Sequence, residues 1–230
     1  MADLERVTRL ELVPVVEVPA WAFSERPMPE GPSRDHRDAW ARYWLECLAD
    51  AGVIGLLPIE RGSMHVATSE FTDPVQIGQV LRRLVEPETL TDPEAASALY
   101  GGIAVESGDH VLTEPHCCGD LADWTEWRSV VTHREAAWKI VWTGHPWLSA
   151  RGEGDDLILS SPHESDAPEP RWVLDRGLIP PAVDAAVAEL ESFASRIAAA
   201  LLDSDGNGSH AVRIARILAG LPTEDEGRRA

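Results

Sequence analysis

The sequence predicts an α+β protein with a mostly antiparallel sheet, inserted helices and a C-terminal helical pair. Strand-like segments are grouped in the middle of the chain and are joined by short turns, which suits antiparallel pairing. Helical patterns are inserted among the strands or follow them, whereas a βαβ fold would alternate the two. The 230 residues, 44% of them hydrophobic, are enough to bury one sizeable core. We therefore expect a single domain over residues 1–222, followed by a disordered tail over residues 223–230.

The N-terminal part is predicted to contain a strand and a helix. A nearly continuous run of Leu and Val over residues 9–18 is typical of a strand. A segment rich in Pro and Gly then indicates a loop. Apolar side chains recur at helical spacing between Trp40 and Ala51. This pattern predicts a helix with an N-cap at Asp35 that ends at Gly52.

Two short strands and a second helix are predicted next. Residues 53–59 and 64–69 have strand-like composition on either side of a turn that contains Gly. Asp73 offers an N-cap, and Pro74 suits the first helical position. Gln76 follows the cap by three residues, as in a capping box. A helix is therefore expected to begin at Pro74.

The second half of the chain is predicted to form a meander followed by two helices. A short helix over residues 94–99 precedes the first strand. The predicted strands occupy residues 101–105, 110–113, 137–143, 147–151 and 157–160. The turn at 107–109 makes a hairpin of the first two strands. An Ala-rich amphipathic helix is expected after Pro181, and a last helix over residues 209–219.

Charge is the most distinctive property of this sequence. It has 39 acidic residues against 20 basic ones, a net charge of −19, and Lys139 is its only lysine. Two stretches, Leu84–Trp127 and Gly152–Pro170, contain no Lys or Arg. This field repels phosphate backbones and anionic lipid, which argues against nucleic acid and membranes as ligands. The acidic surface either maintains solubility or meets a basic partner, and the sequence leaves both explanations open.

The sequence also predicts a cytoplasmic location. Its apolar runs are far shorter than the roughly 20 residues that a membrane-spanning helix needs. The N-terminal residues carry charges of both signs and lack the apolar core of a signal peptide. The three cysteines are an odd number, which does not suit a complete disulfide framework.

The segment from His110 to Asp120 contains the densest group of side chains with chemical potential. The candidate metal ligands are His110, His116, Cys117 and Cys118. Structural zinc sites usually space cysteines two to four residues apart, and adjacent cysteines do not meet this pattern. Zinc is therefore kept as an alternative to the absence of any cofactor, and a strained vicinal disulfide as another. Cys47, on the apolar stripe of its helix, is predicted to be buried and inert.

Cys118 is also a candidate nucleophile, because it precedes a helix predicted to begin at Gly119 and Asp120. The field of a helix N-terminus lowers the pKa of a thiol. Acidic neighbours at Glu114, Asp120 and Asp123 act in the opposite sense and disfavour the thiolate. Asp120 fits an N-cap with Asp123 in the first turn, which is a structural role.

The first base-free stretch and the tryptophans at its end form the predicted contact surface for a partner. Trp is enriched in protein interfaces, and acidic residues attract basic partners. Core packing is the alternative role for these aromatic rings. The candidate contact residues are Glu106, Asp109, Glu114, Asp120, Asp123, Trp124, Glu126 and Trp127.

A second metal pattern lies between the last two predicted helices. Residues 203–208 match the first six positions of an EF-hand calcium loop. The twelfth position is Ile214, where a bidentate glutamate should complete the calcium ligands. A polar turn between helices explains this segment better, and calcium is kept as an alternative.

The string Thr113–Leu121, which contains Pro-His-Cys-Cys-Gly-Asp-Leu, resembles a pattern in small uncharacterised bacterial proteins. Trp124, Trp127 and the later Gly-His-Pro of 144–146 belong to the same resemblance. Some proteins of this type resemble immunity proteins of contact-dependent or polymorphic toxin systems. The resemblance implies an acidic cytoplasmic protein that binds and neutralises a toxin domain, and it transfers no catalytic residue.

Two main hypotheses of function follow from the sequence, and a purely structural or scaffold role is a third possibility. The first is a protein-binding module, an immunity protein that neutralises a basic toxin domain by stoichiometric binding. The alternative is a metal- or cysteine-dependent enzyme centred on the segment from His110 to Asp120. Common phosphate-loop, dinucleotide-binding and serine-hydrolase motifs are absent from the sequence, which favours the first hypothesis.

Overall fold

The computed structural model describes residues 4–205 and 208–223. The chain divides into two compact units, each built from two separate segments. Unit 1 contains residues 1–14 and 100–189, and unit 2 contains residues 15–99 and 190–230. A single domain over residues 1–222 stays a prediction. The predicted tail lies outside the described residues apart from Thr223.

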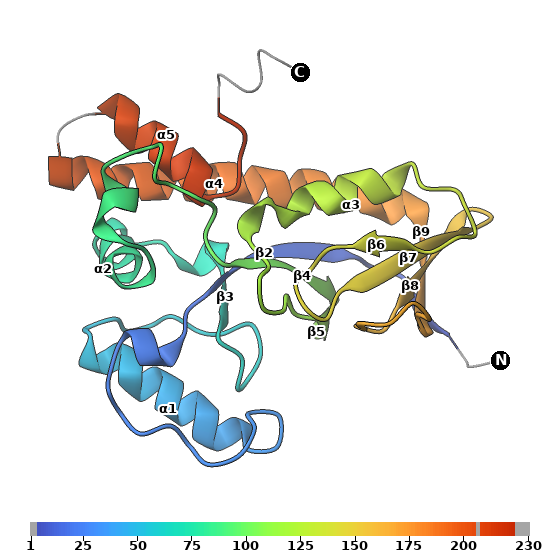
Figure 1. The fold of residues 1–230 in the computed structure, drawn as a ribbon, viewed down its shortest axis with the longest axis horizontal. Coiled ribbons are helices and arrows are strands. Elements are labelled where there is room, and N and C mark those ends of the chain that lie inside the picture. The colour runs from blue at the N-terminus through green and yellow to red at the C-terminus, as the bar shows by residue number, and fades with distance from the viewer. Residues whose placement is uncertain (1–3, 206–207, 224–230) are drawn as a thin grey trace. The chain divides into compact units, whose positions relative to one another are not determined.

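Unit 1 contains a five-stranded sheet with the order β1-β9-β8-β7-β6 (Figure 1). Its strands are β1 (Glu5–Val7), β6 (Lys139–Val141), β7 (Leu148–Glu153), β8 (Asp156–Ser160) and β9 (Pro170–Asp175). Neighbouring strands are antiparallel except for β1 and β9, which are parallel. The same unit contains helix α3 (Trp124–Val131).

A second, four-stranded sheet has the order β3-β2-β4-β5. Its strands are β2 (Glu11–Glu17), β3 (His65–Ala67), β4 (Gly101–Ser107) and β5 (His110–Thr113). In unit 2, β2 pairs with β3 in antiparallel orientation through Val15–Glu17. In unit 1, β4 and β5 form the predicted hairpin, with a register irregularity after Val105.

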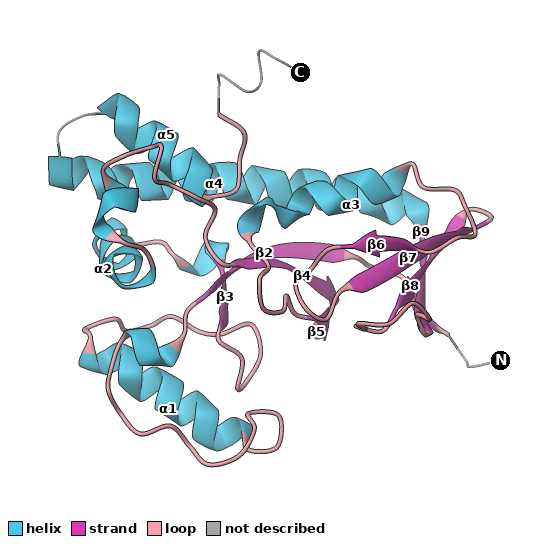
Figure 2. Cartoon of the chain, viewed as in Figure 1, coloured by secondary structure: helices cyan, strands magenta, loops and turns pink. Residues whose placement is uncertain are grey.

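The remaining helices are inserted between strands or follow the last strand (Figure 2). They are α1 (Arg37–Asp50), α2 (Pro74–Leu84), α4 (Ile179–Asp205) and α5 (Gly208–Leu218). The α+β class and the C-terminal helical pair are therefore confirmed. No described helix is long and apolar enough to cross a membrane.

Capping interactions explain where α2 begins, and they differ from the predicted ones at two positions. Asp73 accepts a hydrogen bond from the main-chain N–H of Val75 at 2.9 Å, so the predicted N-cap is confirmed. Gln76 does not complete a capping box, because its amide donates to the carbonyl of Ile54 at 2.6 Å. The N-cap of α1 is His36, where Asp35 was predicted.

Other differences concern short segments whose local pattern is weak. Residues 53–59 are irregular where a strand was predicted. Residues 94–99 contain the end of a turn followed by irregular chain, where a helix was predicted. Both segments contain Gly, Pro or several small residues, so few local interactions favour regular structure. Strands β1 and β9 were not predicted.

Each unit has its own buried aromatic residues. In unit 1, Trp127 and Trp172 are among the largest fully buried side chains. In unit 2, the buried indole of Trp44 donates to the carbonyl of Val18 at 2.7 Å. Cys47, on the same helix as Trp44, has no exposed surface, so its predicted burial is confirmed. Burial raises the pKa of its thiol, which is consistent with the predicted inertness of this cysteine.

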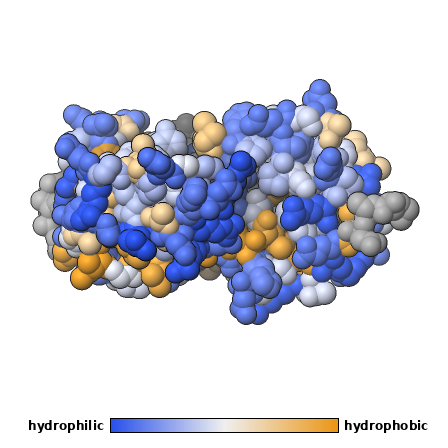
Figure 3. Space-filling view, turned by 90° about the horizontal axis from the view of Figure 1, so that it is seen from below, coloured by the Kyte–Doolittle hydropathy of each residue, from blue (hydrophilic) through white to orange (hydrophobic). Residues whose placement is uncertain are grey.

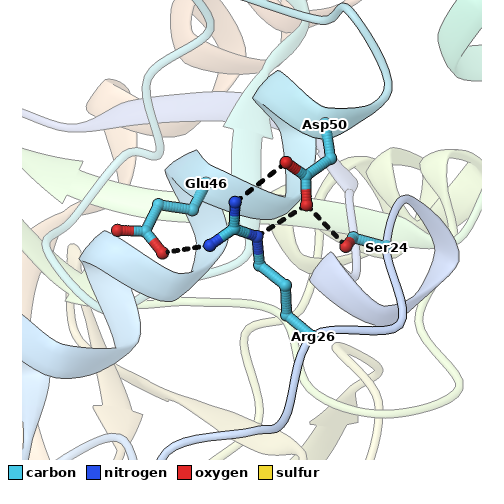
Figure 4. Close-up of polar contacts among 4 residues, drawn as sticks. All are labelled: Ser24, Arg26, Glu46 and Asp50. Carbon is cyan, nitrogen blue, oxygen red and sulfur yellow. Dashed lines mark hydrogen bonds and ion pairs between the residues drawn. The ribbon is translucent and has the colours of Figure 1, made fainter.

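An ion-pair network on unit 2 joins α1 to the segment before it (Figure 4). The Arg26 guanidinium donates to both carboxylate oxygens of Asp50, at 2.6 and 2.9 Å, and to Glu46 at 2.7 Å. Ser24 donates to Asp50 at 2.7 Å. These hydrogen bonds, those of Arg26 first, lower the pKa of Asp50 to about 2. The network fixes the loop before α1, although its exposure to solvent weakens each pair.

Candidate functional site

The two adjacent cysteines occupy the centre of a tight turn in unit 1, residues 116–119, which we call the cysteine turn. The N–H of Gly119 donates to the carbonyl of His116 at 3.2 Å and closes the turn. Cys118, at the third position, has φ +69°. Type II turns favour glycine at this position because a side chain there is strained. Both thiols are nevertheless exposed to solvent.

Main-chain hydrogen bonds from distant segments hold the cysteine turn in place. The N–H of His116 donates to Thr143 at 2.7 Å, and the N–H of His145 donates to Cys117 at 2.9 Å. On the other side, the N–H of Gly101 donates to Gly119 at 3.1 Å. The turn is therefore fixed between the start of β4 and the segment that follows β6.

Glycine is required where these segments touch. A β-carbon on Gly119 would lie 2.6 Å from the carbonyl oxygen of Gly101. A β-carbon on Gly144 would lie 2.3 Å from the carbonyl oxygen of His116. Such distances are far inside van der Waals contact. The backbone of the cysteine turn is thus packed too closely for any other residue at these two positions.

The turn leads directly into a reciprocal cap before α3. Asp120 accepts from the N–H of Ala122 at 2.7 Å, and Asp123 accepts from the N–H of Asp120 at 3.1 Å. The predicted capping roles of both acids are confirmed. Burial raises the pKa of Asp123 from its ordinary 3.8 to about 7, despite that hydrogen bond. This carboxyl is half-buried, and it titrates close to neutral pH.

The raised pKa of Asp123 predicts that stability falls as pH rises from about 4 to about 7. In this range the folded protein holds a proton that the unfolded chain has released. The full shift corresponds to about 4 kcal/mol, which screening at a half-exposed group reduces to about 1–2 kcal/mol. Asp123→Asn retains the acceptor oxygen and should flatten this part of the pH profile in urea unfolding.

The exposed Asp109→Asn is the matched control, since it removes the same charge from the β4–β5 turn. Its profile between pH 4 and 7 should follow that of the wild type. Equal slopes for the wild type and Asp123→Asn would contradict the assignment of this titration to Asp123.

Next to the cysteine turn lies an aromatic cluster of Trp142, His145, Trp147 and His163. The two indole rings are stacked at 17° with centroids 6.3 Å apart. The His145 ring stands edge-on to both, at 5.0 Å from Trp142 and 5.1 Å from Trp147. Both indoles are half-buried and His145 is exposed. Offset or edge-on packing of this kind stabilises aromatic groups, and here it leaves part of each ring accessible.

His163 connects this cluster to an acidic loop at residues 161–170. Its Nδ1 lies 2.8 Å from the carbonyl oxygen of Ser165, so Nδ1 carries the proton. Its Nε2 therefore accepts from the hydroxyl of Ser149 at 2.9 Å. A serine paired with histidine can be a nucleophile, but Ser149 is only 1% exposed. The pair instead anchors the loop to β7.

The acidic loop lies beside the exposed face of the aromatic cluster. Glu164 Oε1 is 4.0 Å from His145 Nδ1, and its side chain is 62% exposed. Asp166 and Glu169 on the same loop are exposed as well. Half-buried indoles and the exposed carboxylate of Glu164 thus lie on one small surface of unit 1.

The predicted partner-contact residues do not form one exposed surface, because several of them are buried or half-buried. Trp124 and Trp127 are 6% and 0% exposed, so their side chains pack in the core and offer no contact surface. Asp120 and Asp123 form the reciprocal cap of the short 3-10 helix Leu121–Asp123 that precedes α3. Asp109 is exposed in the hairpin turn, and three further acids are half-buried. These three are Glu106, Glu114 and Glu126.

The predicted metal ligands do not assemble into a centre. Among the residues that the structure describes, no three His, Cys, Asp or Glu side chains converge as a metal ion requires. His110 lies at the start of β5, whereas Cys117 and Cys118 lie in the cysteine turn. In the calcium-like segment, α4 extends to Asp205, and residues 206–207 lie outside the described part of the chain.

The environment of the thiols does not resemble that of a catalytic cysteine. Cys117 Sγ donates to the main-chain carbonyl of His145 at 3.4 Å, and a carbonyl is no general base. The pKa of the Cys118 thiol is raised, as predicted, but the main cause is the adjacent Cys117 and not the acids. A less ionised thiol is a slower nucleophile at neutral pH.

The aromatic cluster was not predicted as a site from the sequence. It joins two connections, the one between β6 and β7 and the one between β8 and β9, and His163 and Glu164 come from a loop with no motif. The Gly-His-Pro string at 144–146 was the available signal, because Gly and Pro mark turns.

Comparisons with family models, with curated proteins and with solved structures found no match for this chain. The resemblance of the Thr113–Leu121 string to immunity-type proteins stays a prediction.

Proposed function

We propose that this protein is a cytoplasmic protein-binding module that neutralises a basic protein partner, such as a toxin domain, by stoichiometric binding. The observation that best supports this proposal is the surface formed by Trp142, His145, Trp147 and Glu164. It replaces the predicted contact surface around Trp124 and Trp127, whose rings are buried.

The two stacked indoles fit a partner's cationic side chain. Elsewhere in the chain, arginines cover indole faces, as Arg128 does over Trp124 at 4.8 Å and Arg151 over Trp138 at 5.1 Å. Among the described residues, no Arg or Lys stacks on Trp142 or Trp147. A guanidinium from another protein can make the same cation–π contact there while Glu164 accepts its hydrogen bonds.

The charge of the loop and of the whole chain supports a basic partner. The loop at 161–170 contains three acidic residues and no Lys or Arg, within a chain of net charge −19. Long-range attraction raises the rate of encounter, and contacts at Trp142 and Glu164 then determine how long the complex lasts. Trp beside charged residues is the composition of interface hot spots.

Unit 2 offers a second surface that supports protein binding. A groove of about 530 Å³ is lined by Leu45, Leu57 and Pro58, with Arg42 and Arg61 at its margin. Leu45 and Leu57 are 47% and 60% exposed. On the face drawn in Figure 3, hydrophilic residues dominate and apolar residues form small separate patches.

The test is binding between the purified protein and the product of the adjacent gene, measured by calorimetry at low and high salt. Reversing two loop charges, Glu164→Lys with Asp166→Lys, should weaken binding by about 10–100-fold, because both positions face a basic partner. Glu25→Lys with Glu30→Lys changes the net charge equally, and it should reduce affinity far less.

Co-expression with the same product in a growth assay then tests neutralisation. The wild type should protect cells, and the loop-reversal variant should protect less. No retained partner at low salt, or equal affinities for both double variants, would contradict the proposal.

A further inference from the structure

We propose that Cys117 and Cys118 form a reversible redox site, at which a low-molecular-weight disulfide oxidises the two thiols to a vicinal disulfide. This site is independent of partner binding. It differs from both enzyme alternatives considered above, since it needs neither a metal ion nor a catalytic base.

Accessibility is the first supporting observation. Both thiols are exposed, whereas Cys47 is fully buried. Thiol–disulfide exchange requires direct attack of a thiolate on a disulfide sulfur, so only accessible cysteines react. The two cysteines are also adjacent at the centre of one four-residue turn, which the N–H of Gly119 closes by donating to the carbonyl of His116 at 3.2 Å.

The backbone of the turn is the second observation. Cys118 has φ +69°, a conformation in which glycine would avoid the strain. Strained residues persist where the surrounding structure determines them and are concentrated at functional sites. Here the hydrogen bonds to Thr143, His145 and Gly101 hold the turn from both sides. The arrangement therefore presents two thiols on a rigid support.

The length of the linkage makes the disulfide labile. Adjacent α-carbons lie about 3.8 Å apart across a trans peptide, whereas most disulfides join α-carbons separated by about 4.4–6.8 Å. A bond formed at shorter separation is strained, and strained disulfides are reduced more easily than structural ones. The site is thus suited to repeated oxidation and reduction.

The reaction has two exchange steps. One thiolate attacks the oxidant disulfide, which forms a mixed disulfide and releases one small thiol. The second cysteine loses its proton and attacks the protein sulfur of that mixed disulfide, which releases the second small thiol. In total, two protein thiols become one disulfide while the oxidant is reduced to two thiols, so electrons and hydrogens balance.

Oxidation changes the contact between the cysteine turn and the aromatic cluster. Cys117 Sγ donates to the carbonyl of His145 at 3.4 Å in the dithiol form. A disulfide sulfur has no hydrogen to donate, so this contact is lost. His145 packs against both Trp142 and Trp147, and indole fluorescence should report the change.

The test exposes the native protein to mixtures of oxidised and reduced glutathione, then alkylates the free thiols and measures intact mass. The wild type should lose two hydrogens and two alkylation sites together, and dithiothreitol should restore both. Cys47→Ser should behave in the same way. Cys117→Ser and Cys118→Ser should each stop at a mixed disulfide with glutathione, with circular dichroism confirming that they are folded.

Three outcomes would overturn the proposal. The wild type could retain both thiols in every mixture, accumulate only mixed disulfides, or form only disulfide-linked dimers. Because each outcome is read on the wild-type protein, the test does not depend on how well the serine variants fold.

Discussion

Gly144→Ala is expected to destabilise the protein by about 3 kcal/mol or more, because it combines a steric clash with backbone strain. The added β-carbon would lie 2.3 Å from the carbonyl oxygen of His116 and 2.5 Å from that of Cys117. Gly144 also has φ +91°, which side chains rarely adopt. The neighbouring atoms belong to backbone, so rotating a side chain gives no relief. The cysteine turn would have to move away from the segment after β6.

Gly154→Ala is the matched control, because it separates strain from clash. Gly154 also has positive φ, at +62°, but its β-carbon would meet open space. Its replacement should cost only about 1 kcal/mol. Urea unfolding of the three proteins measures the difference, and alkylation of Cys117 and Cys118 reports whether the turn has moved. Equal losses in the two variants would show that the close approach at Gly144 is unimportant.

Much of the fold could be predicted because its signals are local. Asp73 and Pro74 mark the start of α2 through interactions within one turn. The hairpin of β4 and β5 follows from a turn at residues 107–109. In these segments the residues that determine the structure are close in sequence, so propensity and pattern are sufficient.

The missed strands depend on contacts between distant residues. β1 has three residues and pairs in parallel with β9, where Glu5 lies opposite Trp172. A strand this short has too few side chains to show alternation, and its partner is most of the chain away. Pairing of this kind is determined by the assembled sheet and leaves no local pattern.

The candidate site was only partly predictable for the same reason. The cysteine turn and the cap at Asp120 and Asp123 were identified because they lie in one short segment. The pairing of Trp142 with Trp147 depends on how the connection between β6 and β7 folds, and Glu164 approaches His145 only when the connection between β8 and β9 meets it. Trp127 is buried in the core whereas Trp142 is half-buried, and this difference arises only in the folded structure. The composition of the sequence does not distinguish the two residues.

Arg176→Ala is expected to cost about 3 kcal/mol, because one buried guanidinium satisfies carbonyl groups of two elements. Arg176 is only 5% exposed. It donates to the carbonyls of Val130 and His133 at the C-terminal end of α3, and to that of Asp156 on β8 at 3.1 Å. The last carbonyls of a helix lack partners within the helix and favour a positive charge. Alanine would remove the guanidinium donor from all three carbonyls, and the Val130 carbonyl would retain only its main-chain donors from Thr132 and His133.

Two variants test this explanation by chemical denaturation. Arg176→Lys keeps the charge, but one ammonium group cannot reach both elements in the fixed geometry of a guanidinium fork, so an intermediate loss is expected. Arg171→Ala removes an exposed arginine that stacks on Trp172 at 4.8 Å, and it should change stability by less than about 1 kcal/mol. Similar losses for Arg176→Ala and Arg171→Ala would mean that α3 is held to the sheet by packing of Trp127 alone. A large loss only at Arg176 would show that its hydrogen bonds fix α3 against β8. The cap and the cysteine turn, which precede α3 in the chain, would then depend on the same hydrogen bonds.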